Sequence, residues 1–342
     1  MQEPRRARQL GIVVGAMPTG ADNAITDVPG VHVGQTTIVE GDSIRSGVTA
    51  IVPTQLMDRM SLPAGLFVGN GYGKLVGSTQ LVELGEIETP VVLTATLSTF
   101  RAADALVTYV LDLPGRERTR SVNPIVGETN DGYLSDIRAR PVTEAHVLAA
   151  LRGASAARPT EGAVGAGTGT AALGFKAGIG TSSRVAPTDR GEATVGVLVQ
   201  ANFSGVLLVG GVPVPPERVG VTAAGPEPAG NSCMIVVATD ARLDARQLGR
   251  LGRRAVYAMG GVGSDFAGGS GDYAIAFSTA PVDGPPLPES NVDPLFRAVQ
   301  EGTEEALLNS LFMAQTTVGH RGHVRYAVPH DRLLEVLRRS PE

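Results

Sequence analysis

The stretch Ala229-Gly-Asn-Ser-Cys-Met-Ile-Val-Val-Ala-Thr-Asp240 is the most informative part of the sequence. Before it, residues 213–230 are rich in proline, glycine and charge, which indicates an exposed, flexible loop. From Ser232 onward the chain becomes a run of mostly apolar, β-branched residues, which predicts a buried strand. Because side chains alternate along a strand, Ser232 and Cys233 are expected on opposite faces, with Cys233 as a small buried apolar residue.

The junction between Asn231 and Ser232 has two explanations. If the chain is cut there, Ser232 gains a free α-amine beside its own hydroxyl, and an amine of pKa about 7.7–8.0 can act as a general base. The cut follows when the hydroxyl attacks the Asn231 carbonyl, the acyl group moves from nitrogen to oxygen, and water hydrolyses the ester. Gly230 would supply the backbone freedom that a strained peptide needs. The second explanation is an ordinary loop end, because Asn-Ser before a strand is commonplace.

Strands and helices are mixed along the chain without a strict alternation of one strand and one helix. This order favours an α+β layered sandwich over a doubly wound parallel sheet. Residues 195–201 and 206–210 are expected to form a strand pair. The other expected strands are 31–33, 48–52, 90–97, 232–238 and 273–277, and the expected helices are 100–111, 143–151, 245–259, 292–313 and 331–339.

The 342 residues have a globular composition, 42% hydrophobic and 18% charged. A formal net charge of −5 gives no electrostatic case for binding nucleic acid or an anionic membrane. The sequence shows no run of about 18 apolar residues and no secretory signal at the N-terminus, so we expect a cytoplasmic protein. The single cysteine excludes an internal disulfide and a multi-cysteine metal site.

We expect neither a cofactor nor a metal. The glycine-dense segments 69–77, 162–180 and 260–271 match neither G-x-x-x-x-G-K-[ST] nor G-x-G-x-x-G, so nucleotide binding is not favoured. Glycine there permits close backbone approach, and in an enzyme such loops also line a substrate cleft. His320 and His323 have no third ligand nearby, which favours surface histidines over a metal site. The nucleophile elbow G-x-S-x-G is absent from the sequence.

Several segments, taken in order, resemble the DmpA-like family of L-aminopeptidase/D-amino-acid esterases and β-aminopeptidases. The resemblance covers about residues 21–329, and its motifs are specific together although each alone is not. The segment Gly230–Ala241 resembles the self-cleavage site of that family. The other segments are Asp27-Val-Pro-Gly-Val-His-Val-Gly34, Gly69-Asn-Gly-Tyr-Gly73, Val126-Gly-Glu-Thr-Asn-Asp-Gly132, Gly165-Ala-Gly-Thr-Gly169, Lys176-Ala-Gly-Ile-Gly180, Val197-Leu-Val-Gln-Ala-Asn202 and Gly269-Ser-Gly-Asp-Tyr-Ala-Ile-Ala-Phe277.

This resemblance implies one domain over residues 1–342, a four-layer α-β-β-α sandwich similar to N-terminal-nucleophile hydrolases but with its own connectivity. It also implies that the precursor cuts itself into an α chain, 1–231, and a β chain, 232–342, which stay associated. The implied activity is that of a serine aminopeptidase or amidase, which releases N-terminal residues from small peptides, amides or esters through an acyl-enzyme on Ser232. Family precedent implies a homo-oligomer, a tetramer of processed protomers.

Carried over residue by residue, the resemblance implies four catalytic groups. Ser232 is the nucleophile, and the side-chain amide of Asn202 stabilises the oxyanion. Ser270 and Asp272 form a serine–acid pair that relays protons and orients the nucleophile. Some members have glutamate at the position of Asp272, which leaves its detailed role open. Turn formation is the structural alternative for Asn202 and for the Ser270–Asp272 pair.

The resemblance also implies that Glu128 and Tyr133 line the site that receives the substrate amine. A surface carboxylate and ordinary packing are the structural alternatives for these two residues. Three other functions remain open at this stage: an oligoamide endo-hydrolase, an acyltransferase of the same fold, and a small-molecule binder that never cuts itself. The acyltransferase family of similar fold uses a threonine nucleophile, so Ser232 argues against it.

Overall fold

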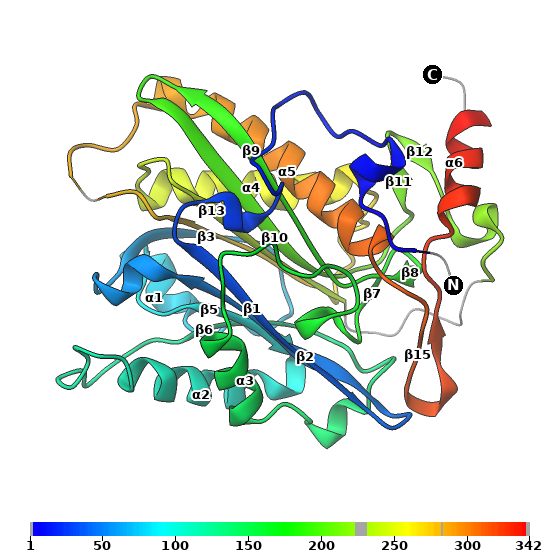
Figure 1. The fold of residues 1–342 in the computed structure, drawn as a ribbon, viewed down its shortest axis with the longest axis horizontal. Helices are drawn as coiled ribbons and strands as arrows, with labels where there is room; N and C mark the ends of the chain where they lie inside the picture. Colours follow the sequence, from blue (N-terminus) through cyan, green and yellow to red (C-terminus); the bar gives the residue numbers. More distant parts are fainter. Residues whose placement is uncertain (1–2, 223–230, 282, 340–342) are drawn as a thin grey trace.

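The computed structural model describes residues 3–222, 231–281 and 283–339. Two sheets lie face to face, and helices cover the outer face of each, so the elements form four layers (Figure 1). One sheet has four strands in the order β1-β2-β5-β6, and the other has six in the order β4-β3-β14-β13-β10-β9. The expected α+β sandwich is therefore confirmed.

The bounds of the elements follow. The four-stranded sheet contains β1 (Val31–Glu40), β2 (Ile44–Pro53), β5 (Val91–Ala95) and β6 (Ile125–Thr129). The six-stranded sheet contains β3 (Leu62–Gly71), β4 (Glu86–Ile87), β9 (Ile179–Thr188), β10 (Gly191–Asn202), β13 (Ser232–Thr239) and β14 (Gly271–Ser278). The helices are α1 (Ser78–Leu84), α2 (Thr99–Leu111), α3 (Glu144–Arg152), α4 (Ala245–Gly261), α5 (Asp293–Phe312) and α6 (His330–Arg339).

The described residues also form three short strand pairs outside the two sheets. They are β7 (Ala171–Ala172) with β8 (Phe175–Lys176), β11 (Leu208–Val209) with β12 (Val212–Pro213), and β15 (Thr317–Val318) with β16 (Val324–Arg325). Within the described parts of the chain, no helix is long and apolar enough to cross a membrane.

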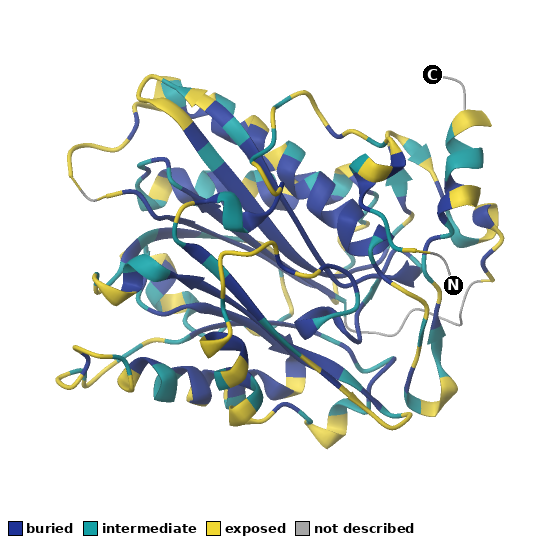
Figure 2. Cartoon of the chain, viewed as in Figure 1, coloured by how far each residue is buried: buried dark blue, intermediate teal, exposed yellow. Residues whose placement is uncertain are grey.

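Alternation along β13 explains why both faces of the six-stranded sheet are buried. Cys233, Ile235 and Val237 belong to the apolar layer between this sheet and helices α4 and α5. Met234 and Val236 point the other way, into the layer between the two sheets. A third apolar layer joins the four-stranded sheet to α2 and α3. Figure 2 shows these layers as dark blue strands and inward helix faces, with exposed residues on the rim and outer surfaces.

The expected strand pair 195–201 with 206–210 is wrong. Residues 195–201 lie in β10, but β10 pairs with β9 and β13 on its two sides. The later segment forms β11, which turns back on β12 through Gly210 and Gly211. Both glycines have positive φ, 58° and 79°, as a two-residue hairpin turn between twisted strands requires. The Gly-Gly dipeptide was thus the local signal that β11 pairs with the residues after it and not with β10.

Candidate active site

Ser232 lies at one end of the six-stranded sheet, where three strands bring distant parts of the chain together. It is the first residue of β13 and lies directly across from Asn202, the last residue of the antiparallel strand β10. On its other side it pairs with Gly271, the first residue of the parallel strand β14. By alternation, Ser232 and Asn202 both face the layer between the two sheets.

The hydroxyl of Ser232 contacts the peptide that precedes it. Ser232 Oγ donates a hydrogen bond of 2.6 Å to the carbonyl oxygen of Asn231, and the backbone N–H of Gly271 donates one of 3.2 Å to the same oxygen. The Ser232 side chain is buried. Negative charge that develops on the Asn231 oxygen would therefore meet a fixed backbone donor, as in an oxyanion hole.

Close backbone approach at this point requires glycine. A Cβ atom at Gly271 would lie 2.5 Å from the Cα and N atoms of Gly73 and 3.1 Å from Ser232 Oγ. Gly73 and Gly271 belong to two of the glycine-dense segments, 69–77 and 260–271. The sequence-based interpretation that these segments permit close approach is therefore confirmed at this pair.

Ser270 and Asp272 are in direct contact. Ser270 Oγ donates a hydrogen bond of 2.7 Å to Asp272 Oδ1, and Asn70 Nδ2 donates one of 3.1 Å to Asp272 Oδ2. Burial raises the pKa of Asp272, while the hydrogen bonds from Ser270, Asn70 and the backbone of Cys233 oppose that rise. The carboxylate is thus held at both oxygens, beside the strand that carries Ser232.

Asn202 is oriented by a neighbouring hairpin. The backbone N–H of Ala171 in β7 donates a hydrogen bond of 3.1 Å to Asn202 Oδ1. An amide presents its oxygen and its NH2 group in different directions, so this bond turns the NH2 end away from the hairpin. The Asn202 side chain is buried and lies across the strand pair from Ser232.

Ser232 opens onto a cavity of about 250 Å³ that also contains Glu128. Glu128 comes from β6 of the four-stranded sheet, so the cavity lies where the two sheets meet. Most of the described residues that line it are polar, and Leu97 and Ile137 are the two aliphatic ones. The lining residues are Tyr72, Lys74, Thr96, Leu97, Glu128, Asn130, Ile137, Asn231, Ser232 and Gly269.

Glu128 is a buried carboxylate with one oxygen engaged. Its side chain is 2% exposed, and Oε1 accepts a hydrogen bond of 2.9 Å from the backbone N–H of Lys74, with Lys74 Nζ at 3.8 Å. Within the described residues, Oε2 has no hydrogen-bond partner. Burial raises the pKa of Glu128, and the backbone N–H and ammonium of Lys74, together with the nearby Thr96 hydroxyl, oppose the rise. The free oxygen in the cavity wall suits a cationic group of a ligand.

Tyr133 lies in a smaller cavity next to the first. This cavity shares Asn130 and Asn231 with the larger one and is also lined by Asn202. The Tyr133 ring is stacked on His323 with centroids 4.5 Å apart, and the guanidinium of Arg325 lies 4.1 Å from its centroid. The structure therefore places Tyr133 near Asn202 and Asn231, and outside the cavity wall that holds Glu128.

Comparison with known proteins places this geometry in a family. The model of peptidase family S58 matches residues 23–325. The chain belongs to peptidase family S58. It is therefore a hydrolase of the aminopeptidase type, as its sequence predicts.

Relatives of this S58 peptidase cover almost the whole chain. The β-peptidyl aminopeptidase BapA of Sphingosinicella xenopeptidilytica is 40% identical, over 97% of this chain and 91% of its own length. A β-aminopeptidase of a Burkholderia species has a solved structure with a TM-score of 0.89 and 38% identity, over 98% of each chain. The L-aminopeptidase D-Ala-esterase/amidase of Ochrobactrum anthropi has a TM-score of 0.88 and 36% identity, over 97% of this chain and 98% of its own. That last structure is described as a variant of the N-terminal-nucleophile hydrolase fold, and the present fold is of the same class.

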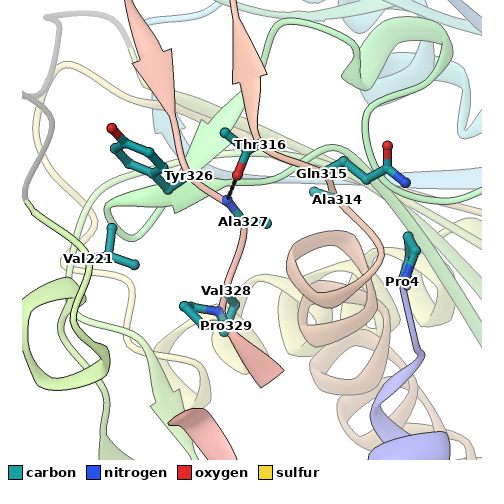
Figure 3. A pocket seen from close by; sticks show the side chains of 9 residues that line it. All are labelled: Pro4, Val221, Ala314, Gln315, Thr316, Tyr326, Ala327, Val328 and Pro329. Atoms are coloured by element: carbon teal, nitrogen blue, oxygen red, sulfur yellow. Dashed lines mark hydrogen bonds between the residues drawn. The ribbon is translucent and has the colours of Figure 1, made fainter. Parts of the chain in front are cut away.

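A separate cavity of about 270 Å³ lies away from these residues (Figure 3). Among the described residues that line it, none is charged and none is a predicted site residue. We therefore do not assign it to the S58 reaction. It is lined by Pro4, Val221, Ala314, Gln315, Thr316, Tyr326, Ala327, Val328 and Pro329.

Sequence reasoning missed three groups of the candidate site. These are Asn70, which holds Asp272, Lys74, which holds Glu128, and the backbone N–H of Gly271. Each lies in a glycine-dense segment or next to one, and that clustering was the available signal. Cys233 is correctly predicted as a buried residue: burial raises the pKa of its thiol well above the ordinary value, which keeps it protonated.

Proposed function

We propose that this S58 peptidase cuts itself between Asn231 and Ser232, and that Ser232 is then its nucleophile. Residues 1–231 and 232–342 would stay together as one sandwich domain, because β13 and β14 of the second part pair with β10 and β3 of the first part. The contact of Ser232 Oγ with the Asn231 carbonyl oxygen, in a cavity shared with Glu128, is the observation that supports this proposal most directly.

In the proposed reaction the free α-amine of Ser232 accepts the proton of its own hydroxyl as Oγ attacks the substrate carbonyl carbon. The Asn202 amide donates to the oxygen that gains negative charge, a contact typically worth about 3–4 kcal/mol at the transition state. The amine then returns the proton to the leaving group, and the acyl group remains on Oγ. Water hydrolyses this ester, while Ser270 and Asp272 orient the Ser232 amine and hydroxyl.

The proposed substrates are small peptides, amides or esters with a free N-terminal amine. Glu128 Oε2 would accept the ammonium group inside the cavity, where the carboxylate lacks another partner within the described residues. Several relatives are β-aminopeptidases, which supports a β-amino acid as the released residue. The cytoplasmic location, the homo-oligomer and the role of Tyr133 in substrate binding stay predictions.

A panel of aminoacyl p-nitroanilides tests this function. We expect hydrolysis of β-alanyl p-nitroanilide to exceed hydrolysis of its N-acetyl derivative, and we expect the Ser232→Ala variant to hydrolyse neither. Comparison of β-alanyl, L-alanyl and D-alanyl substrates then ranks the preferred residue. Hydrolysis by Ser232→Ala at the wild-type rate would contradict the assignment of the nucleophile.

A further inference from the structure

Lys176 is a buried cation that the proposed reaction does not use. It is one of only two lysines in the chain, the other being Lys74, and its side chain is fully buried. Removing an ammonium group from water is unfavourable unless hydrogen bonds and charge compensate for it. Such a group at the edge of a catalytic site therefore needs a physical explanation.

Lys176 uses all three of its N–H donors on backbone carbonyls of one loop. Nζ donates to the oxygens of Gly167, Thr170 and Ala177, at 3.1, 2.8 and 2.5 Å. An ammonium group has three donors, so this set is complete. Lys176 thereby ties together both ends of the β7–β8 hairpin, which runs between Thr170 and Ala177.

The same hairpin holds the oxyanion-stabilising amide. Ala171 is the residue paired with Lys176 in the hairpin, and its N–H is the donor that fixes Asn202 Oδ1. The hairpin is also attached to the end of β10 through the N–H of Leu173, which donates to the carbonyl of Phe203 at 2.9 Å. A shift of the hairpin would therefore rotate the Asn202 amide relative to Ser232.

Asp131, which is also buried, interacts electrostatically with Lys176, and burial raises the pKa of Asp131 to about 7. Burial lowers the pKa of Lys176 to about 7, and the charge of Asp131 opposes that fall. The loop packs tightly on Asp131, because a Cβ atom at Gly169 would lie 2.8 Å from the Asp131 Cβ. The loop that Lys176 holds is thus packed directly against Asp131.

We propose that Lys176 is a positioning residue of the active site: through the β7–β8 hairpin and the Ala171 N–H, it aims the Asn202 amide at the reacting carbonyl. The inference rests on the proposed function, in which Asn202 stabilises the oxyanion. It adds a residue that touches neither substrate nor nucleophile and acts only through Asn202.

A double-mutant cycle tests the proposal. Lys176→Met keeps an unbranched side chain out to the ε position but removes the ammonium group with its three donors, and it is compared with Asn202→Ala and with the double variant. Both the self-cleavage rate of the precursor and kcat and KM per processed site are measured with β-alanyl p-nitroanilide. We expect Asn202→Ala to slow turnover by roughly 10²–10³-fold and Lys176→Met by at least ~10-fold, each with KM within about 3-fold of the wild type. The double variant should be within about 3-fold of Asn202→Ala, because both changes disable one donor.

A merely structural lysine gives a different result. If the losses from Lys176→Met and Asn202→Ala multiply in the double variant, or if Lys176→Met leaves kcat unchanged, the proposal is overturned. An unchanged kcat in Asn202→Ala alone would instead contradict the proposed role of Asn202. Should Lys176→Met fail to fold, Lys176→Gln, which retains an amide donor, is used in the same cycle and read in the same way.

Arg116 offers a matched control. It too is a buried cation that donates to backbone carbonyls, those of Leu56 and Arg59 at 3.0 and 3.2 Å, but it lines neither cavity of the site. Arg116→Met should lower Tm and leave kcat and KM unchanged. An equal loss of kcat in Arg116→Met and Lys176→Met would show a general effect of removing a buried cation and would overturn the proposal.

Discussion

The hydroxyl of Ser232 lies 2.6 Å from the carbonyl oxygen of Asn231, the residue before it, and donates a hydrogen bond to that oxygen. The same oxygen accepts the N–H of Gly271 from the neighbouring strand. The peptide proposed to be cut is therefore held by its own nucleophile and by the sheet at once. Self-cleavage and catalysis would use the same set of groups, because both pass through an oxyanion next to Ser232 Oγ.

Gly271→Ala should slow self-cleavage. The new Cβ would lie 2.5 Å from the backbone of Gly73 and 3.1 Å from Ser232 Oγ, so the start of β14 must shift and move its N–H relative to Asn231. We expect a loss of at least ~10-fold in the rate, equivalent to about 1.4 kcal/mol in the barrier. The conversion of precursor to two fragments on a denaturing gel measures it.

Gly268→Ala is the control for that change. Among the described residues, no atom lies within 4 Å of a Cβ built at Gly268, and its φ is not positive, so alanine fits there without strain. Its self-cleavage rate should equal that of the wild type. If the Gly271→Ala precursor is cut as fast as the Gly268→Ala precursor, the close approach of the Gly271 backbone to Gly73 and Ser232 is not needed for self-cleavage.

Glu128→Gln should weaken discrimination between free and blocked amines. The ammonium group of a free substrate would lose a charge-assisted hydrogen bond, worth roughly 1.5–3 kcal/mol, whereas an N-acetyl substrate makes no such bond. In the wild type we expect kcat/KM for the free substrate to exceed that for the acetylated one by at least ~10²-fold at pH 7. The variant should bring the two values closer together, mainly by lowering kcat/KM for the free substrate. The control is Glu83→Gln, at an exposed position, which should leave the ratio as in the wild type. Equal kcat/KM for the two substrates in the wild type would instead favour an endo-amidase.

The pH dependence of KM should report the ionisation of Glu128. Burial raises its pKa, so as pH falls the carboxylate is protonated earlier than an ordinary glutamic acid. Only the ionised form pairs with the ammonium group, so KM for a free amine should rise with falling pH, beginning above the ordinary glutamic acid range. In Glu128→Gln, this rise of KM with falling pH should be absent. If KM rises in the same way in the variant, the group that titrates is not Glu128.

Activity should not depend on a metal ion. Among the residues that the structure describes, no group of three histidine, cysteine, aspartate or glutamate side chains is placed to hold one. The proposed chemistry uses the Ser232 amine and the Asn202 amide for the tasks that a metal would otherwise perform. We expect full turnover after prolonged dialysis against EDTA. A loss that added zinc restores would contradict this prediction.

The fold could be predicted from the sequence where local patterns agree with the tertiary structure. The apolar spacing of residues 100–111 predicts α2 to within one residue, and the apolar run after Ser232 predicts β13. Pairing was harder to predict, because β10 pairs with β9, which directly precedes it, and with the more distant β13, while Gly210 and Gly211 form a local hairpin. The sequence separation of two apolar strands does not by itself predict whether they pair with each other.

The site could be predicted in part. The resemblance named Ser232, Asn202, Ser270 and Asp272, and the structure brings them to one end of the sheet. Two features were not predictable from residue types: the backbone N–H of Gly271, which any residue but proline has, and the role of Lys176, whose partners are carbonyls. Both features depend on how the loops pack against one another at this end of the sheet, which residue types alone do not predict.

The identity of the new N-terminus tests the central claim most directly. Purified protein is separated on a denaturing gel, and the smaller fragment, expected to contain residues 232–342, is sequenced from its N-terminus. We predict two bands and the sequence Ser-Cys-Met-Ile-Val, with a single uncut band in Ser232→Ala. A wild-type chain that stays intact while it hydrolyses β-alanyl p-nitroanilide, a different first residue, or continued cleavage in Ser232→Ala would contradict the account.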